Sequence, residues 1–495
     1  MKKFITLDVG TTAVKAAIFS EDLKLLASAV REYRLDAPGK GLLELNPDVY
    51  WDNAVAGIRQ ILEETGTAAD EVASVTCTTQ GETLIPVDEE GNALHNAVIW
   101  LDSRAQAEAD EIAKSITPEQ FYSKTGVPEI NGYCPVAKLL WFKRNLPECY
   151  DRTHKFLLLE DYLVFRLSGK FVTNPSIMCT TGYFDIRNNE LWSEILEVSG
   201  IDPQKIAEIL PCGAVVSGLT DRAASELGLT TDTAVTTGAM DQTAGAVGAA
   251  NVREGVVSET TGTAMVIAAT AREPQLDHLS AVNVYTHAIP GLYLNISMVQ
   301  TAGMVQKWFR DELCQDLEGS AAFAEMSSLA AAAPPLSRGV MLYPHFTGIQ
   351  EPANDPDARG VFFGIGLDAD RGCLIRAIYE GIGYALRENL ELMGLKPERI
   401  VSLGGGSKSD IWNQIKADIC GAAVEVPVIS EAASLGAAIL GGVATGILPD
   451  IVSAAEMVEK DRQYPPMAGN TELYEKGYRK YCAMYERFAP LFKEG

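Results

Sequence analysis

The chain has 495 residues, and its 66 acidic and 41 basic side chains give a formal net charge of −25. That length exceeds what one hydrophobic core usually serves, so two domains of ordinary size are expected. A field of that sign repels nucleic acids and anionic membranes, and we expect neither as a partner. If the ligand is itself a polyphosphate, then backbone N–H groups, a divalent cation or a few placed cations must receive it.

The cysteines and the apolar segments indicate a cytoplasmic protein. Nine cysteines are dispersed, with no CxxC pair and no Cys/His cluster at metal-ligand spacing, which is typical of chains whose thiols stay reduced. The apolar stretch at the N-terminus is short and broken by Asp8, so it predicts a first strand and not a signal peptide. The most apolar run, residues 434–445, is shorter than the ~20 residues that a membrane span needs.

Two Gly/Thr turns, half a chain apart, lie between runs of residues that favour β-strands. The first unit is residues 4–19, with its turn at residues 10–12, and the second is residues 255–267, with its turn at residues 261–263. Each unit predicts a β-hairpin. The repeat of one supersecondary unit suggests two halves of similar construction, each of which opens with a hairpin.

Strand-like and amphipathic helical stretches alternate between the hairpins and after them. The strand-like stretches include residues 72–78, 97–100 and 234–237, and the helical stretches include residues 47–64 and 320–333. Such alternation is typical of α/β proteins. We therefore predict an α/β protein with two domains, residues 1–245 and residues 246–495.

The turn of the first hairpin carries groups that suit a phosphate chain. Gly10 allows a tight turn, and the N–H groups and hydroxyls of Thr11 and Thr12 can point at phosphate oxygens, with Lys15 close by. Asp8, at the end of the first strand, is well placed to hold Mg²⁺ directly or through water. The same residue types also suit an ordinary polar turn.

The turn of the second hairpin, around Gly262 and Thr263, allows the same two interpretations. If the two halves face each other across a cleft, both turns converge on one phosphate chain. Neither turn matches the GxxxxGK[ST] pattern, so the sequence does not predict a P-loop protein.

A third loop, residues 404–409, lies between a strand-like run at residues 400–403 and a helix that begins at about Asp410. A strand, a glycine loop and a helix N-terminus favour a nucleotide or phosphate site. A nicotinamide-dependent dehydrogenase is an alternative, because the loop is one residue away from the GxGxxG fingerprint and Glu425 lies where a ribose-binding acid would be.

Asp241 follows a predicted strand at residues 234–237 and a predicted glycine turn at Gly238, and it precedes a helix of small residues at 243–250. An aspartate at this place suits a helix N-cap. It also suits a general base that accepts a hydroxyl proton during phosphoryl transfer, because a helix N-terminus and a nearby Mg²⁺ would keep the carboxylate ionised.

Taken together, these motifs resemble the FGGY family of carbohydrate kinases over essentially the whole chain. The motifs, in family order, are LDVGTTAVKAAIF, ELNP with YW, VIWLDSRA, GAMDQTAGAVGA, SETTGTA, TAGMVQKWFRDE, YPHFTG, SLGGGSKSDIWNQIKADICGAAVEVP and EAASLGAAILGG. The resemblance implies a two-domain, actin-like (ribonuclease H-like) ATPase fold with an interdomain catalytic cleft. It also implies that MgATP is the phosphate donor, and it suggests a homodimer.

The resemblance implies a role for each matching residue. Asp241 corresponds to the catalytic base, and Asp8 with Asp241 would place Mg²⁺. The residues that would contact ATP are Thr11, Thr12, Lys15, Gly262, Thr263, Gly303, Gly404, Gly405 and Ser409. The residues that would hold the sugar or polyol are Glu82, Tyr133, Asp241 and Gln242.

Some positions depart from the patterns of family members. Ser409 replaces an asparagine that is common in glycerol kinases, and Gly81 stands where those enzymes have an arginine that contacts glycerol. Loss of that arginine removes a hydrogen-bonding cation and opens volume, so we expect a substrate that is bulkier than glycerol or differently oriented. The Gln-Gly-Glu-Thr segment also differs from the Gln-Met-His-Gly of xylulose kinases.

The sequence therefore predicts an ATP-dependent kinase that phosphorylates a hydroxyl group of a small sugar or polyol. Candidate substrates are a ketopentose, a tetritol such as erythritol, glycerol, and an aldonate such as gluconate. An aldonate would require a cation in the sugar pocket. A sugar-sensing regulator with the actin-like fold is a further alternative, although Asp241 is present and no DNA-binding segment precedes Asp8.

Overall fold

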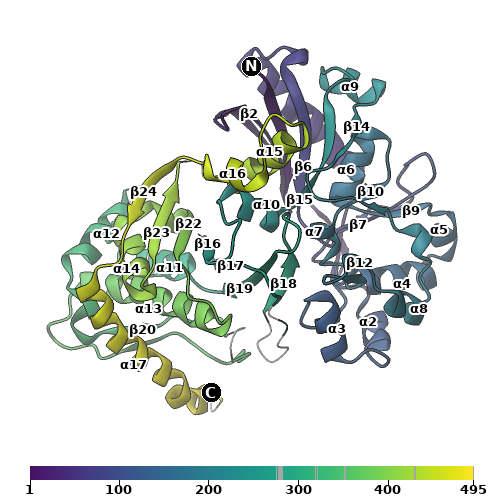
Figure 1. The fold of residues 1–495 in the computed structure, drawn as a ribbon. Helices are drawn as coiled ribbons and strands as arrows, with labels where there is room; N and C mark the ends of the chain where they lie inside the picture. Colours follow the sequence, from purple (N-terminus) through teal and green to yellow (C-terminus); the bar gives the residue numbers. More distant parts are fainter. Residues whose placement is uncertain are drawn as a thin grey trace.

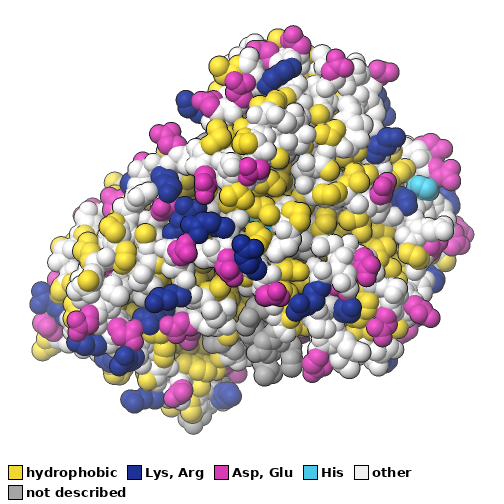
Figure 2. Space-filling model, viewed as in Figure 1, with side chains coloured by type: hydrophobic (Ala, Val, Ile, Leu, Met, Phe, Trp, Pro, Cys, Tyr) yellow, Lys and Arg dark blue, Asp and Glu magenta, His cyan; other side chains and the backbone are white. Residues whose placement is uncertain are grey.

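The computed structural model describes residues 1–274, 276, 282–317, 319, 321–349, 353–428 and 431–493. Two large sheets lie in opposite halves of the molecule, and helices α10, α15 and α16 lie between the halves (Figure 1). On the face in Figure 2, acidic and basic side chains are interspersed. No helix of the described residues has the length and hydropathy to cross a membrane.

The N-terminal half is organised around a six-stranded sheet in the order β14-β15-β6-β1-β2-β3. Its strands are β1 (Lys3–Val9), β2 (Ala13–Ser20), β3 (Leu25–Glu32), β6 (Val72–Thr79), β14 (Val215–Gly218) and β15 (Ala234–Met240). Strands β1 and β2 form the predicted hairpin, and both β1 and β15 run parallel to β6. The carboxyl ends of β1 and β15 therefore meet at one edge of the sheet.

A second sheet of the N-terminal half has the order β4-β5-β8-β7-β9. Its strands are β4 (Asp36–Gly39), β5 (Leu42–Leu45), β7 (Leu84–Val87), β8 (Ala97–Val98) and β9 (Lys155–Leu158). Two short pairs accompany it, β10 (Val172–Thr173) with β13 (Glu208–Ile209) and β11 (Phe184–Asp185) with β12 (Glu190–Leu191).

Helix α1 shows how local sequence sets the helices of this half. The Asn46 side chain caps its first turn, Pro47 occupies a position where no N–H is needed, and Gly66 ends the helix in the left-handed conformation at φ 60°. The helices of this half are α1 (Pro47–Thr65), α2 (Gln106–Ile112), α3 (Pro118–Thr125), α4 (Pro135–Asn145), α5 (Pro147–Arg152), α6 (Leu159–Ser168), α7 (Pro175–Met178), α8 (Ser193–Ser199), α9 (Asp221–Leu227) and α10 (Asp241–Gly248).

The C-terminal half contains a seven-stranded sheet in the order β18-β19-β17-β16-β22-β23-β24. Its strands are β16 (Val256–Thr261), β17 (Met265–Ala271), β18 (Asn283–Thr286), β19 (Tyr293–Val299), β22 (Arg399–Gly404), β23 (Ala423–Pro427) and β24 (Lys460–Tyr464), and β20 (Met341–Tyr343) pairs with β21 (Val361–Phe363). Strands β16 and β17 form the second predicted hairpin, and β16 runs parallel to β22. The hairpin and its parallel neighbour repeat the arrangement of β1, β2 and β6.

Helices α13 and α14 form the centre of the C-terminal core, where Tyr379 stacks on Trp412 with ring centroids 4.6 Å apart. The helices of this half are α11 (Gly303–Leu313), α12 (Ala322–Ala332), α13 (Arg371–Leu392), α14 (Asp410–Cys420), α15 (Ala432–Ala444), α16 (Ile451–Glu456) and α17 (Ala468–Phe492).

Helix α15 joins the two halves. Although it lies between β23 and β24 of the C-terminal sheet in the chain, it packs against α10 and against β1, β6 and β15 of the N-terminal sheet. Close contact is possible because glycines face the partner backbone. A Cβ atom at Gly436 would lie 1.8 Å from the Ala244 carbonyl oxygen, and one at Gly248 would lie 1.9 Å from the Ala432 carbonyl oxygen.

The α/β prediction and both predicted hairpins are confirmed, as are helices close to residues 47–64 and 320–333. One local prediction is wrong. The strand predicted at residues 234–237 does not end in a turn at Gly238 but continues to Met240, and the helix begins at once with Asp241. The boundary near residue 245 stays a prediction.

Replacing Gly436 by alanine should destabilise the protein, because the new methyl group meets backbone atoms that cannot move aside. We expect a loss of about 3 kcal/mol in the free energy of unfolding, measured by chemical denaturation. Gly469→Ala is the matched control, because Gly469 is helical and has no neighbour within 4 Å of its Cβ position. An unchanged unfolding midpoint in Gly436→Ala would contradict the close contact.

Candidate functional site

Asp8 and Asp241 both line a cavity between the two halves. Asp8 is the second-last residue of β1, and Asp241 is the first residue of α10, directly after β15. Because both strands flank β6 in parallel, the fold brings their carboxyl ends together. The cavity has a volume of 380 Å³ and is also lined by Gln242. Its far wall comes from the C-terminal sheet and includes Ser258, Thr260, Leu403 and Gly404.

The pKa values of both carboxyl groups are raised. Burial raises the pKa of Asp241 to about 7, and the charge of Asp8 adds to this, while a hydrogen bond from the Gln242 N–H to Oδ1 (2.7 Å) opposes it. Burial also raises the pKa of Asp8. The positive charge of Lys15 lowers this pKa, and the negative charge of Glu431 raises it. We expected the helix N-terminus to keep Asp241 ionised. In the protein alone, the effect of burial on the pKa outweighs the effect of the helix N-terminus.

Lys15 connects the two halves at this cavity. It lies opposite Asp8 in the first hairpin, and its ammonium group forms an ion pair with Glu431, which directly precedes α15. Sequence reasoning missed Glu431, because it is separated from Lys15 by most of the chain. The motif EAASLGAAILGG begins with it, so the resemblance was the available signal.

The turn of the second hairpin lies over a second cavity of 610 Å³. The cavity brings together most of the predicted ATP contacts, namely Gly262, Thr263, Gly303, Gly405 and Ser409, and adds Met304, Phe323 and Trp412 to its wall. Gly303 donates its N–H to the Gly262 carbonyl (3.0 Å), and a Cβ atom at Gly303 would lie only 2.3 Å from that oxygen. Only glycine therefore allows the turn to lie so close to α11.

A buried ion pair stabilises the strand that leads into the turn of the second hairpin. Lys416 donates to Glu259 at 2.5 Å and to the hydroxyl groups of Thr261 and Ser402 at 3.2 and 3.3 Å. Both charged side chains are fully buried. Breaking such a pair is costly, so it fixes the strand that carries the turn.

Glu82 lies in a strained turn beside Asp241. Its φ is +54°, and the Thr83 N–H bonds back to the Gly81 carbonyl at 2.7 Å. Burial raises the pKa of the Glu82 carboxyl, Lys138 lowers it, and Asp241 raises it further. Lys138 is a second residue that sequence reasoning missed. Its buried ammonium group donates to the Ile99 carbonyl at 2.9 Å and lies 3.4 Å from the Glu82 carbonyl oxygen.

The structure does not support the expectation that Gly81 opens volume. A Cβ atom at Gly81 would lie 3.0 Å from the Thr180 hydroxyl and 3.2 Å from the sulfur of Met240. These two side chains fill the space that a larger residue would need. A bulkier substrate therefore does not follow from Gly81.

The remaining predicted residues lie outside the two cavities. Among the described residues, Thr12 and Tyr133 are exposed. Neither cavity is lined by Thr11, Thr12, Lys15, Glu82 or Tyr133. The Thr11 hydroxyl donates to the Gln80 side chain (2.9 Å) and accepts from the Trp100 indole (3.0 Å). Glu425 is engaged by Lys460 at 2.8 Å and Arg399 at 3.5 Å.

The described residues contain no group of three or more His, Cys, Asp or Glu side chains that could hold a metal ion. The pair Asp8 and Asp241 nevertheless suits Mg²⁺. That ion usually keeps several waters and takes one or two carboxylates together with substrate phosphates. A divalent cation would also favour the ionised forms of both carboxyl groups, whose pKa values burial raises.

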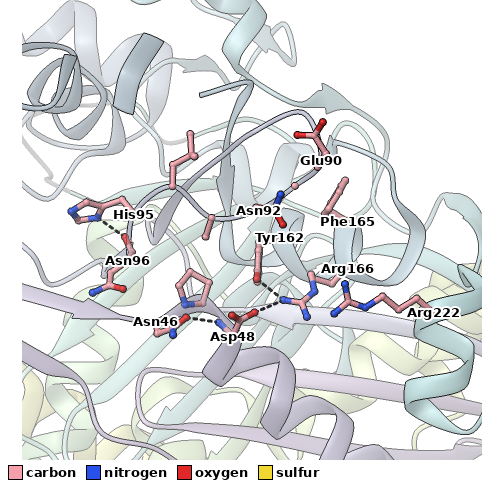
Figure 3. Close-up of a pocket in the computed structure, with 14 residues that line it drawn as sticks. Asn46, Asp48, Glu90, Asn92, His95, Asn96, Tyr162, Phe165, Arg166 and Arg222 are labelled. Carbon is pink, nitrogen blue, oxygen red and sulfur yellow. Dashed lines mark hydrogen bonds and ion pairs between the residues drawn. The ribbon is translucent and has the colours of Figure 1, made fainter. Parts of the chain in front are cut away.

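Another hollow lies on the N-terminal half, away from the predicted residues. It is a cavity of 600 Å³ that shares Asp48, Arg166 and Arg222 with a neighbouring cavity of 640 Å³. Figure 3 shows Arg166 beside Tyr162 and Asp48, to which it donates at 2.7 and 2.8 Å. Arg222 bonds Glu226 at 2.8 Å. Both arginines are thus paired with acids, and none of the predicted site residues lines this hollow.

Comparison with known proteins identifies the family. The sequence matches the N-terminal domain of the FGGY family of carbohydrate kinases over residues 3–248 and the C-terminal domain of that family over residues 256–445. It is 28% identical to the autoinducer-2 kinase of Salmonella choleraesuis, over 97% of this chain and 94% of that protein. It is 25% identical to the gluconokinase of Bacillus subtilis, over 94% of this chain and 92% of that one.

The structural similarity covers both halves. Ligand-bound xylulose kinase from Lactobacillus acidophilus superposes with a TM-score of 0.88 and 26% identity over 100% of both chains. The fold is therefore the two-domain actin-like ATPase fold of the FGGY kinases, as the resemblance implied. The chain belongs to the FGGY family of carbohydrate kinases, and it is a phosphotransferase that acts on an alcohol group of a sugar.

Proposed function

We propose that the chain transfers the γ-phosphoryl group of MgATP to a hydroxyl group of a small neutral sugar or polyol, such as a ketopentose or a tetritol, with Asp241 as the general base. The observation that carries the proposal is the position of Asp241. It lies in the cavity between Asp8, on the N-terminal side, and Thr260 and Gly404, on the C-terminal side.

ATP would span the two cavities. The adenosine would lie in the cavity of 610 Å³, where Phe323 and Trp412 supply apolar walls, and the phosphates would extend past Gly404 toward Asp8. Gly262, Thr263 and Gly405 would approach the phosphates with their backbone N–H groups. Lys15 would meet the phosphate chain from the N-terminal side, with Thr11 and Thr12 in the turn beside it.

Asp8 and Asp241 would hold Mg²⁺, which would neutralise charge on the phosphates when it is bound. Asp241 would orient the attacking hydroxyl group and accept its proton. The raised pKa of Asp241, about 7, suits a group that must take up a proton near neutral pH. Closure of the halves would exclude water from the cavity.

The sugar would lie on the N-terminal half, with its hydroxyl groups bonded to Glu82, Tyr133 and Gln242. Glu82 lies close enough to Asp241 for the charge of Asp241 to raise its pKa, and two acidic groups at this place favour a neutral substrate over an aldonate. The curated relatives include both an autoinducer-2 kinase and a gluconokinase, so the identity of the sugar is a matter for experiment. Membership of a kinase family removes the dehydrogenase and regulator alternatives.

Asp241→Asn should abolish most sugar-dependent turnover, because asparagine cannot accept the hydroxyl proton. We expect kcat to fall by about 10²- to 10⁴-fold, with ADP binding retained. The measurement is ADP release with MgATP over a panel of ketoses, polyols and aldonates. Asp232→Asn is the matched control, because Asp232 is exposed near the opposite end of the same strand. Turnover that survives in Asp241→Asn would overturn the assignment of the base.

Gly405→Leu should weaken ATP binding without harming the fold. The nearest atom to a Cβ at Gly405 is 3.9 Å away, so a larger side chain fits the backbone but projects into the cavity for adenosine. We expect the KM for ATP to rise by about tenfold or more, which corresponds to about 1.4 kcal/mol. The KM for the sugar and the unfolding midpoint should stay unchanged. An unaltered KM for ATP would place the nucleotide elsewhere.

A further inference from the structure

Strand β15 separates from its neighbour just before Asp241. Its pairing with β6 is regular at Thr236 and resumes at Ala239, and Gly238 lies within the irregular stretch. A Cβ atom at Gly238 would lie 1.7 Å from the Cys77 carbonyl oxygen, so glycine is required there. The last residues before Asp241 are therefore not held by regular sheet pairing alone.

Buried side chains hold these residues in addition to the pairing that resumes at Ala239. Gly238 donates its N–H to Oε1 of Glu160 at 2.9 Å, and Met240 donates its N–H to the hydroxyl of Ser176 at 3.0 Å. Asn174 connects the two acceptors. Its Nδ2 donates to Oε1 of Glu160 at 2.7 Å, and its Oδ1 accepts from the Ser176 hydroxyl at 2.7 Å.

This connected group, Glu160, Asn174 and Ser176, is buried and lies outside the catalytic cavity. The exposed fractions of its members are 1%, 1% and 0%, and none of them lines the cavity that holds Asp241. Asn174 is itself fixed, because its Oδ1 caps α7. Since Met240 directly precedes Asp241, a shift of the group would move the carboxylate.

We propose that Glu160, acting through Asn174 and Ser176, is a positioning residue that sets the place of Asp241 in the cleft. The proposal rests on the proposed function, in which Asp241 is the base. A displacement of about 1 Å in a reacting group can cost about 10²-fold in rate, so a residue without contact to substrate can govern turnover.

Glu160 acts in its protonated form. Burial raises the pKa of Glu160 to about 8, the charge of Asp161 adds to this, and the two hydrogen bonds oppose it. Among the described residues, the other titratable groups that interact with it are the thiols of Cys77 and Cys212, and its Oε2 has no hydrogen-bond partner. An ionised carboxylate with a free buried oxygen is costly, whereas the neutral acid still offers Oε1 to Gly238.

The first test is a comparison of substitutions at Glu160. Glu160→Ala should lower kcat by about 10- to 100-fold, while the KM for ATP stays within about twofold, because the ATP cavity belongs to the other half. Glu160→Gln should restore kcat at pH 7, since glutamine is a neutral isostere with an acceptor at the same place. Asp161→Ala is the matched control, because this adjacent buried acid bonds Leu158 and not β15. It should lower stability but leave kcat unchanged.

The second test uses alkaline pH. As the pH rises through about 8, Glu160 of the wild type ionises, and the resulting buried charge should disturb β15. Wild-type kcat should therefore fall above this pH, and Glu160→Gln should lack that fall. If Glu160 contributed only to stability, Glu160→Gln would not remove the alkaline fall in kcat.

Each outcome decides the proposal. It is overturned if Glu160→Ala keeps its kcat, if Glu160→Gln is as slow as Glu160→Ala, or if the alkaline fall persists in Glu160→Gln. If Glu160→Ala does not fold, Ser176→Ala replaces it, because it removes the acceptor for Met240 and the hydroxyl group that bonds Asn174 but leaves Glu160 in place, and an unchanged kcat there would overturn the proposal. Turnover that survives Asp241→Asn would instead refute the proposed function, so the two failures are distinguishable.

Discussion

Helices α10 and α15 approach each other so closely at Gly248 and Gly436 that neither position has room for a Cβ atom. Asp241 starts one of these helices, and Glu431 directly precedes the other. The contact therefore fixes the distance between the end of β15 and the group that pairs with Lys15. Backbone atoms in contact cannot adjust as side chains can, so the geometry of the cleft depends on this pair of glycines.

The same cleft carries more negative than positive charge. Asp8, Asp241 and Glu431 are three acids in a protein of charge −25, and Lys15 is their nearby cation. Burial raises the pKa values of Asp8 and Asp241; the charge of Glu431 adds to the rise at Asp8, and the charge of Asp8 adds to the rise at Asp241, so a bound cation would favour the ionised form of both groups. A negatively charged protein that binds a triphosphate must offset the repulsion with groups that lie close to the phosphates. Glycine turns that expose N–H groups, together with the metal that we propose, are a physical solution with little need for basic side chains.

The sequence predicted the parts of the fold and site that depend on local patterns. Two hairpins and the glycine loop at residues 404–409 follow from residue types within short windows, and the structure has them. The error at Gly238 has a tertiary cause. Glycine there avoids the Cys77 carbonyl oxygen and does not end the strand. Glu160, Lys138 and Glu431 were missed because their roles arise from contacts between distant segments, which no local pattern encodes.

Hydrogen bonds within the N-terminal half connect the turn of the first hairpin with the turn that carries Glu82. Gln80, beside the turn that carries Glu82, accepts from the Thr11 hydroxyl at 2.9 Å and donates to Thr83 at 3.1 Å. Trp100 bonds the same Thr11 and Thr83 hydroxyl groups. A change in the turn of the first hairpin would therefore move the turn of Glu82. Under the proposed function, this coupling would align the acceptor hydroxyl with the phosphate chain, and alignment is the main contribution that a protein makes to phosphoryl transfer.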